Sequence, residues 1–299
     1  MYNYMKFQQK SINKMKNSIQ KIVFFLFLFS LTTPSVSTAQ AWPKSKGSGF
    51  YKLDYSVIRA TDVYDKTGEV VPFRTLTNHT ASFYGEYGIT NKLTVMAYVP
   101  FFVRNTVNAT KGAQTGNIIE QGISNNNLGD IDVAFRYGLY NKNGISVSAN
   151  LFLGLPTGDA KQSDGLFTGD GEFNQMLKIA VGTGKSKWWT QAAAGFNNRT
   201  KGFSDEFRYD FEFGYKLFND RLLAIFKING IESLNNGTAK EALAGLFSNN
   251  VEFMGVGPEF LYYINKKKNM GVSLRFAGAL KGQNVLAAPS TAFGFFAEF

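Results

Sequence analysis

The chain of 299 residues contains no cysteine and a single histidine. The lack of cysteine excludes a secreted scaffold that is held together by disulfide bonds. His79 is the only imidazole available as a catalytic base, and Ser82, three residues further on, falls on the opposite face of a strand from it. We therefore expect no enzymatic activity, no catalytic residues and no cofactor.

The chain also lacks a long apolar run. Its longest, Ile22 to Leu31, has ten residues, whereas a helix that spans a bilayer needs roughly twenty. A membrane protein without such a helix has to cross as strands, because only a closed barrel then satisfies every backbone hydrogen-bonding group inside the lipid.

The amino-terminal region has the composition of a secretory signal peptide. Its elements are the basic residues Lys16 and Lys21, the apolar run Ile22 to Leu31 and the small-x-small cleavage site Ser37-Thr38-Ala39. We expect residues 1–39 to be this signal, with Met5 or Met15 as alternative starts, and residues 40–299 to form a single mature domain.

The net charge of +10 comes largely from that leader. Five of the 32 basic residues and none of the 22 acidic residues precede residue 40, so 27 basic groups face 22 acidic groups in the rest of the chain. This small excess is not the electrostatic footprint of a nucleic-acid-binding protein, and we expect no nucleic-acid partner.

Apolar and polar residues alternate strictly from Phe207 to Leu217. A period of two predicts a strand with one face toward lipid and the other toward a lumen. Twelve segments show this pattern: Gly49 to Arg59, Asn78 to Ile89, Leu93 to Val103, Asp130 to Leu139, Ile145 to Leu155, Phe173 to Gly182, Trp188 to Asn198, Phe207 to Leu217, Leu222 to Glu232, Val251 to Ile264, Met270 to Leu280 and Ser290 to Phe299.

The connections between these segments alternate in length. Five are tight and rich in turn-forming residues: 90–92, 141–144, 183–187, 219–221 and 265–269. Most of the others are longer: 60–77, 104–127, 156–172, 200–206, 233–250 and 281–289. Short periplasmic turns and long external loops predict an all-β fold, a transmembrane antiparallel up-and-down β-barrel of about twelve strands. A periplasmic β-sandwich gives no reason for this alternation.

The last segment ends on an aromatic residue. Phe293, Phe295 and Phe299 lie on one face of it, an ending typical of the closing strand of bacterial outer-membrane barrels. We expect these residues to be an assembly signal read by the barrel-assembly machinery. The predicted location is the outer membrane of a Gram-negative bacterium, in contact with its lipid.

Two short motifs resemble a known family. Asn127-Leu128-Gly129-Asp130 opens one predicted strand, and Gly154-Leu155-Pro156-Thr157-Gly158 closes the next. Together with the strand from Leu93 to Pro100, they are similar to the outer-membrane barrels of the meta-pathway phenol-degradation family. The resemblance implies a transporter-like barrel, associated with uptake of aromatic or other hydrophobic compounds. The residues themselves also allow a purely structural role at strand ends.

The inward face of the predicted barrel carries nearly balanced charge. Its charged residues are Lys52, Arg136, Lys178, Arg208, Lys216, Lys227 and Arg275 with Asp54, Glu86, Asp130, Asp132, Asp210, Glu212, Glu259 and Glu298. They form either a salt-bridge network that stiffens the wall or a field that lines a pore, with Arg136 and Arg208 as candidates for solute contact.

Space and apolar side chains are also predicted inside the barrel. Small inward residues such as Gly138, Ser146, Ser148 and Ala180 leave room for a narrow passage or a binding cavity. Tyr84, Met96, Tyr98 and Phe152 project inward and either pack within the wall or form an apolar patch for a small-molecule solute. The sequence thus predicts a passive channel with a lean toward hydrophobic solutes, or alternatively a structural or adhesive barrel with a closed lumen and functional external loops.

No metal site is predicted with defined ligands. The glycine-rich stretch from Thr157 to Glu172 contains the acids Asp159, Asp164, Asp170 and Glu172, whose oxygen atoms suit Ca²⁺. The stretch lacks the fixed spacing of an EF-hand loop, so a solvated acidic loop is the alternative.

Overall fold

The computed structural model describes residues 40–161, 165–239 and 247–299. The predicted signal peptide, Met5, Met15 and Asp164 lie outside these residues. In the described ranges the regular elements are β1 (Gly49–Tyr64), β2 (Val70–Gly88), β3 (Leu93–Val107), β4 (Thr110–Lys111), β5 (Ile118–Glu120), β6 (Ile123–Asn127), β7 (Ile131–Lys142), β8 (Ile145–Leu155), β9 (Asn174–Lys185), β10 (Trp188–Arg199), β11 (Glu206–Leu217), β12 (Leu222–Ser233), β13 (Glu252–Tyr263), β14 (Met270–Gln283), β15 (Val285–Leu286) and β16 (Ser290–Glu298).

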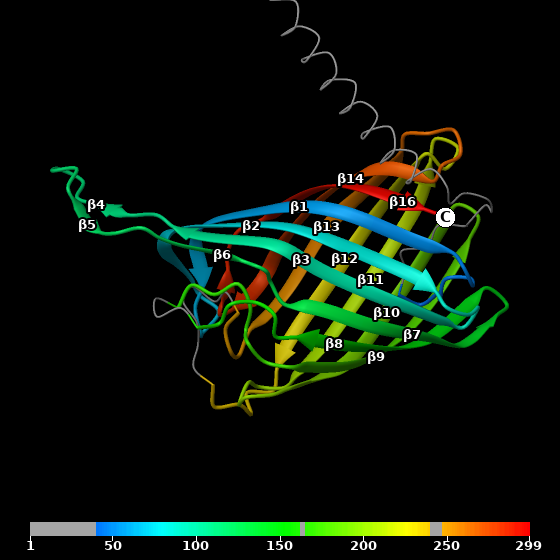
Figure 1. Cartoon of the computed structure of the whole chain (residues 1–299), viewed down its shortest axis with the longest axis horizontal. Coiled ribbons are helices and arrows are strands. Elements are labelled where there is room, and N and C mark those ends of the chain that lie inside the picture. Colours follow the sequence, from blue (N-terminus) through cyan, green and yellow to red (C-terminus); the bar gives the residue numbers. More distant parts are fainter. Residues whose placement is uncertain (1–39, 162–164, 240–246) are drawn as a thin grey trace, which may run out of the picture. The chain divides into compact units, whose positions relative to one another are not determined.

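Twelve of these strands close into one antiparallel barrel. Each long strand pairs with the next along the chain, and β1 pairs with β16 from Phe50 opposite Glu298 to Ile58 opposite Ser290. Figure 1 shows the long strands running side by side around the wall. The short β6 and β15 extend the sheet beside β3 and β1, while β4 and β5 form a separate hairpin. The predicted all-β barrel is therefore confirmed.

The predicted strand positions agree with the structure to within a few residues, with one exception. The stretch 60–77 was expected to be a loop, but β1 and β2 continue through most of it and remain paired as far as Tyr64 opposite Val70. A tight turn joins them, in which Asp65 accepts hydrogen bonds from the backbone N–H groups of Thr67 and Glu69. Turn residues at 65–69 thus mark the true end of the hairpin.

The two faces of the wall differ in chemistry. Along β16, Phe293 and Phe295 are exposed on the outer face, whereas Phe296 and Glu298 are buried inside. The same alternation exposes Phe135 of β7 and buries Arg136. An apolar outer face with a polar interior is the arrangement that suits a barrel in a bilayer. Within the described ranges, no helix is long and apolar enough to cross a membrane.

Ion pairs tie the inward faces of distant strands together. Lys52 of β1 contacts Glu259 of β13 at 2.8 Å, and Glu259 also binds Lys227 of β12 at 2.5 Å. Arg275 of β14 reaches Asp54 of β1 at 3.4 Å. The predicted salt-bridge network is therefore present in part of the lumen, where it links strands that lie far apart along the chain.

Candidate functional site

The segment Gln40–Lys44 lies inside the barrel rather than outside it. Ala41 is fully buried, and its N–H donates to Gln191 Oε1 at 3.0 Å. The hydroxyl groups of Ser146 and Ser148 donate to the carbonyl oxygens of Ala41 and Gln40 at 2.7 and 2.8 Å. These contacts fix the segment to the inner faces of β8 and β10.

Small inward residues make room for this segment. A Cβ atom on Gly182 would lie 2.3 Å from the indole of Trp42, and one on Gly138 would lie 2.9 Å from Pro43. The small residues Gly138, Ser146, Ser148 and Ala180 were predicted to leave room for a narrow passage or a binding cavity. The structure fills it with the chain's own residues, which come from a position too distant in sequence for any local pattern to reveal.

Arg136 anchors the same segment. Its guanidinium group donates to Glu86 Oε2 at 3.3 Å, to Asn150 Oδ1 at 3.0 Å and to the carbonyl oxygen of Trp42 at 3.0 Å. Glu86 also accepts a hydrogen bond from Tyr84. The predicted candidates Tyr84, Met96 and Arg136 therefore belong to one buried polar cluster under Trp42, so their observed contacts are with protein groups.

An aromatic cluster fills the rest of this end of the lumen. Phe50 stacks on Phe296 with ring centroids 5.9 Å apart, and Phe296 meets the edge of Tyr263 at 5.2 Å. Trp189 joins the cluster and donates its indole N–H to Glu212 at 2.7 Å. The half of the barrel nearer the tight turns is consequently packed with side chains and with the amino-terminal segment.

A cavity of about 360 Å³ remains toward the other end. It is lined by Asn78, Thr80, Tyr98, Pro100, Val103, Gly129, Asp130, Asp132, Phe152, Gly154, Thr168, Asp170, Asn174, Met176, Asn197, Arg208 and Phe247. Three predicted candidates, Tyr98, Phe152 and Arg208, are among these residues. Asn174, Met176 and Asn197 were not among the predicted candidates, although they occupy alternate, inward-facing positions of β9 and β10 and are therefore lumen residues.

The loop between β8 and β9 folds over this cavity. Leu166 is fully buried in an apolar cluster with Leu76 and Val107. Thr168 donates its hydroxyl to the carbonyl oxygen of Leu128 at 2.9 Å, and Asn105 donates to the carbonyl oxygen of Phe167 at 2.6 Å. The loop is therefore part of the folded wall around the cavity.

Asp130 joins the two sequence motifs at the base of this loop. Its carboxylate accepts hydrogen bonds from the backbone N–H groups of Gly158 and Asp170, both at 2.8 Å. Burial raises the pKa of Asp130 to about 6; the two hydrogen bonds act in the opposite direction, and the charge of Asp170 adds to the rise. The motif residues Asp130 and Gly158 thus have a structural role, and Asp130 also lines the cavity.

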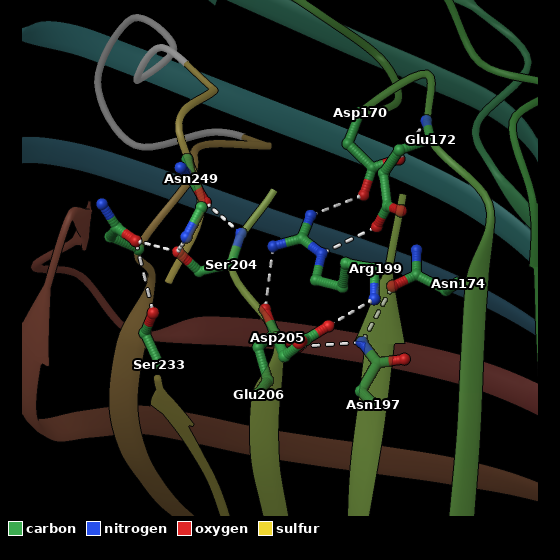
Figure 2. Close-up of polar contacts among 12 residues, drawn as sticks. Asp170, Glu172, Asn174, Asn197, Arg199, Ser204, Asp205, Glu206, Ser233 and Asn249 are labelled. Carbon is green, nitrogen blue, oxygen red and sulfur yellow. Dashed lines mark hydrogen bonds and ion pairs between the residues drawn. The ribbon is translucent and has the colours of Figure 1, made fainter. Parts of the chain in front are cut away.

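Arg199 of β10 holds the other end of the loop. Figure 2 shows its guanidinium group between three carboxylates: Asp170 at 3.0 Å, Glu172 at 2.7 Å and Glu206 of β11 at 2.9 Å. Burial raises the pKa of Glu172 although Arg199 donates to it. Two of the acids considered for Ca²⁺ are therefore paired with an arginine, and the described residues contain no group of three or more potential metal ligands suited to an ion.

The closed twelve-stranded antiparallel barrel defines the class of the protein as an outer-membrane-type β-barrel with an internal cavity. Residues 65–288 match the family described as "Putative MetA-pathway of phenol degradation". Because the match covers most of the chain, the protein belongs to this family. No curated protein matches the sequence.

Similar solved structures have low sequence identity to this chain, and the first of the three below shares its fold. The COG4313 outer membrane channel from Pseudomonas putida F1 is 12% identical, with a TM-score of 0.64 over 89% of this chain and 100% of that one. The Ralstonia pickettii toluene transporter TbuX is 9% identical, with a TM-score of 0.41 over 86% and 90%. The CymD monoaromatic hydrocarbon channel is also 9% identical, with a TM-score of 0.41 over 85% and 89%.

Proposed function

We propose that the protein is a passive outer-membrane channel for small solutes with a preference for hydrophobic ones. The observation that carries this proposal is the cavity inside the lumen. Its wall combines the apolar side chains of Tyr98, Phe152 and Met176 with a few polar groups, the usual composition of a small-molecule site. The fold shared with the Pseudomonas putida channel is compatible with this role.

A structural barrel with a closed lumen is the second candidate. The segment Gln40–Lys44 and the aromatic cluster around Phe296 favour it, because they occupy the lumen beside the tight turns. A channel requires that a solute pass this packed half. The channel candidate therefore predicts solute uptake that depends on the protein and on its cavity, whereas the closed barrel predicts uptake that depends on neither.

Uptake by whole cells separates them. Cells with an intact outer membrane, with and without the protein, would receive a radiolabelled aromatic compound such as toluene at low concentration. Protein-dependent uptake should fall when Tyr98 and Phe152 are both replaced by alanine, because each ring contact contributes on the order of 1 kcal/mol. Phe211→Ala, on the exposed outer face, is the matched control. Uptake equal with and without the protein would favour the structural barrel.

Export and location form part of the same proposal. We expect residues 1–39 to be removed before assembly. In the assembled barrel, we expect Phe135 and similar outward-facing residues to contact lipid. Mass spectrometry of protein extracted from outer membranes should find an amino terminus within a few residues of Gln40. Retention of the apolar run from Ile22 would contradict the signal assignment.

A further inference from the structure

The cavity contains a buried acceptor that no described residue satisfies. Asn197 of β10 is 1% exposed, and its amide oxygen has no hydrogen-bond partner among the described residues. A buried polar atom without a hydrogen-bond partner lowers the stability of the folded protein, so each such atom calls for a physical explanation.

The orientation of this amide is fixed by its neighbours. Asn197 Nδ2 donates to Glu206 Oε2 at 3.0 Å and to Asn174 Oδ1 at 2.8 Å. A flipped amide would place its oxygen against the Glu206 carboxylate, which has no proton to offer when ionised. The oxygen therefore faces away from Glu206, as Figure 2 shows, and Asn197 is a lining residue of the cavity.

Asp132 supplies a second acceptor on the same wall. It lines the cavity, and its carboxylate makes no hydrogen bond or direct ion pair with the residues that the structure describes, although the nearby charge of Arg208 attracts it. The other charged residues that line the cavity have partners. Asp170 pairs with Arg199, Asp130 accepts hydrogen bonds from two backbone N–H groups, and Arg208 contacts Glu206 at 2.6 Å. Among the acidic residues that line the cavity, Asp132 is thus the one whose carboxylate has no hydrogen-bond donor among the described residues.

Gly154 lets the side chains of Asp132 and Asn174 lie close against the wall of the barrel. It pairs with Asp132 of β7 on one side and with Asn174 of β9 on the other. A Cβ atom at Gly154 would lie 3.1 Å from Asp132 Oδ1 and 2.9 Å from Asn174 Cβ. Asp132, Asn174 and Asn197 therefore lie near one another along one side of the cavity, and the rings of Tyr98 and Phe152 contribute apolar surface to the same cavity.

We propose that Asp132 and the Asn197 amide oxygen form an acceptor site for the hydrogen-bond-donating end of a small amphipathic solute, a hydroxyl or amine on an apolar body. This inference rests on the proposed channel function and names its substrate class. Carboxylate solutes are disfavoured at this site, because it offers acceptors and because the negative charge of Asp132 repels an anion. A plain hydrocarbon would leave both acceptors without a donor.

The test compares benzyl alcohol, toluene and benzoate in the uptake assay at sub-saturating concentration. For the unaltered protein, we expect initial rates that favour benzyl alcohol over toluene by about tenfold, as a charge-assisted hydrogen bond allows, and no protein-dependent uptake of benzoate. In Asp132→Leu, which removes both acceptor oxygens, the preference should disappear. In Asp132→Asn, which keeps one acceptor oxygen, it should be intermediate.

Folding of each variant is checked by its heat-modifiable migration in gels. If Asp132→Leu does not fold, the nearly isosteric Asp132→Asn decides the question. Protein-dependent uptake of toluene and benzyl alcohol at equal rates, or a preference unchanged in the folded variants, would overturn the acceptor site and leave the channel function intact. Protein-independent uptake of both compounds would overturn the channel function and the site together.

Discussion

Replacing Arg136 by methionine should destabilise the barrel strongly. The guanidinium group and the Glu86 carboxylate are both about 1% exposed and form an ion pair at 3.3 Å. Arg136→Met removes the cation but leaves the carboxylate buried. It also removes the donor to the carbonyl oxygen of Trp42, so the amino-terminal segment loses one of its anchors.

The magnitude follows from the burial of this pair. Removing one partner of a buried ion pair costs about 3–5 kcal/mol, whereas replacing both by uncharged residues of similar volume is often nearly neutral. The double variant Arg136→Met, Glu86→Gln should therefore recover most of the loss. The coupling energy in a double-mutant cycle should be about 3 kcal/mol or more, since the double variant recovers most of the loss and the two groups are in direct contact.

The assay is reversible unfolding of the barrel in lipid vesicles by guanidinium chloride, followed by tryptophan fluorescence. The four proteins of the cycle are measured at one pH and one lipid composition. Equal free energies of unfolding for Arg136→Met and for the double variant would refute the reasoning, because the loss of stability would then not come from the unpaired Glu86 carboxylate.

Four further predictions concern the rest of the chain. Asn117→Cys, between β4 and β5, should react with a membrane-impermeant maleimide in whole cells, whereas Asn143→Cys in a tight turn should not; the reverse labelling would invert the topology. Phe299→Ala should lower the amount of folded barrel in the outer membrane, as gels and quantitative blots would show, and equal amounts would remove its role in assembly. Deletion of residues 40–46 should raise single-channel conductance in planar bilayers, because it empties part of the lumen; unchanged conductance would mean that this segment does not limit the path. Burial raises the pKa of Asp130 from its ordinary 3.8 to about 6, so the folded barrel binds a proton there more tightly than the unfolded chain does. The free energy of unfolding should therefore rise as the pH falls from about 6 toward 4. Denaturant titrations at several pH values should show a smaller rise for Asp130→Asn than for the unaltered protein.

The sequence by itself determined the barrel. Strict alternation, as in Phe207 to Leu217, specifies which side chains face lipid, because successive residues in a strand point to opposite faces. Turn residues at 90–92 and 141–144 mark where the chain reverses. These signals are local, so twelve strands and the tight turns between them could be read in order. The same alternation placed Tyr98, Phe152 and Arg208 inside the barrel.

The contents of the barrel were decided only by the tertiary structure. Tyr84 and Tyr98 share the inward face of neighbouring strands, yet one packs in the cluster under Trp42 and the other lines the cavity. No periodic pattern distinguishes them, because the difference comes from Gln40–Lys44 entering the lumen and from the loop around Leu166 folding over the opposite end. Inward orientation is a property of a single strand. The depth of a side chain and its partners across the lumen depend on how the barrel closes and on which segments fill it.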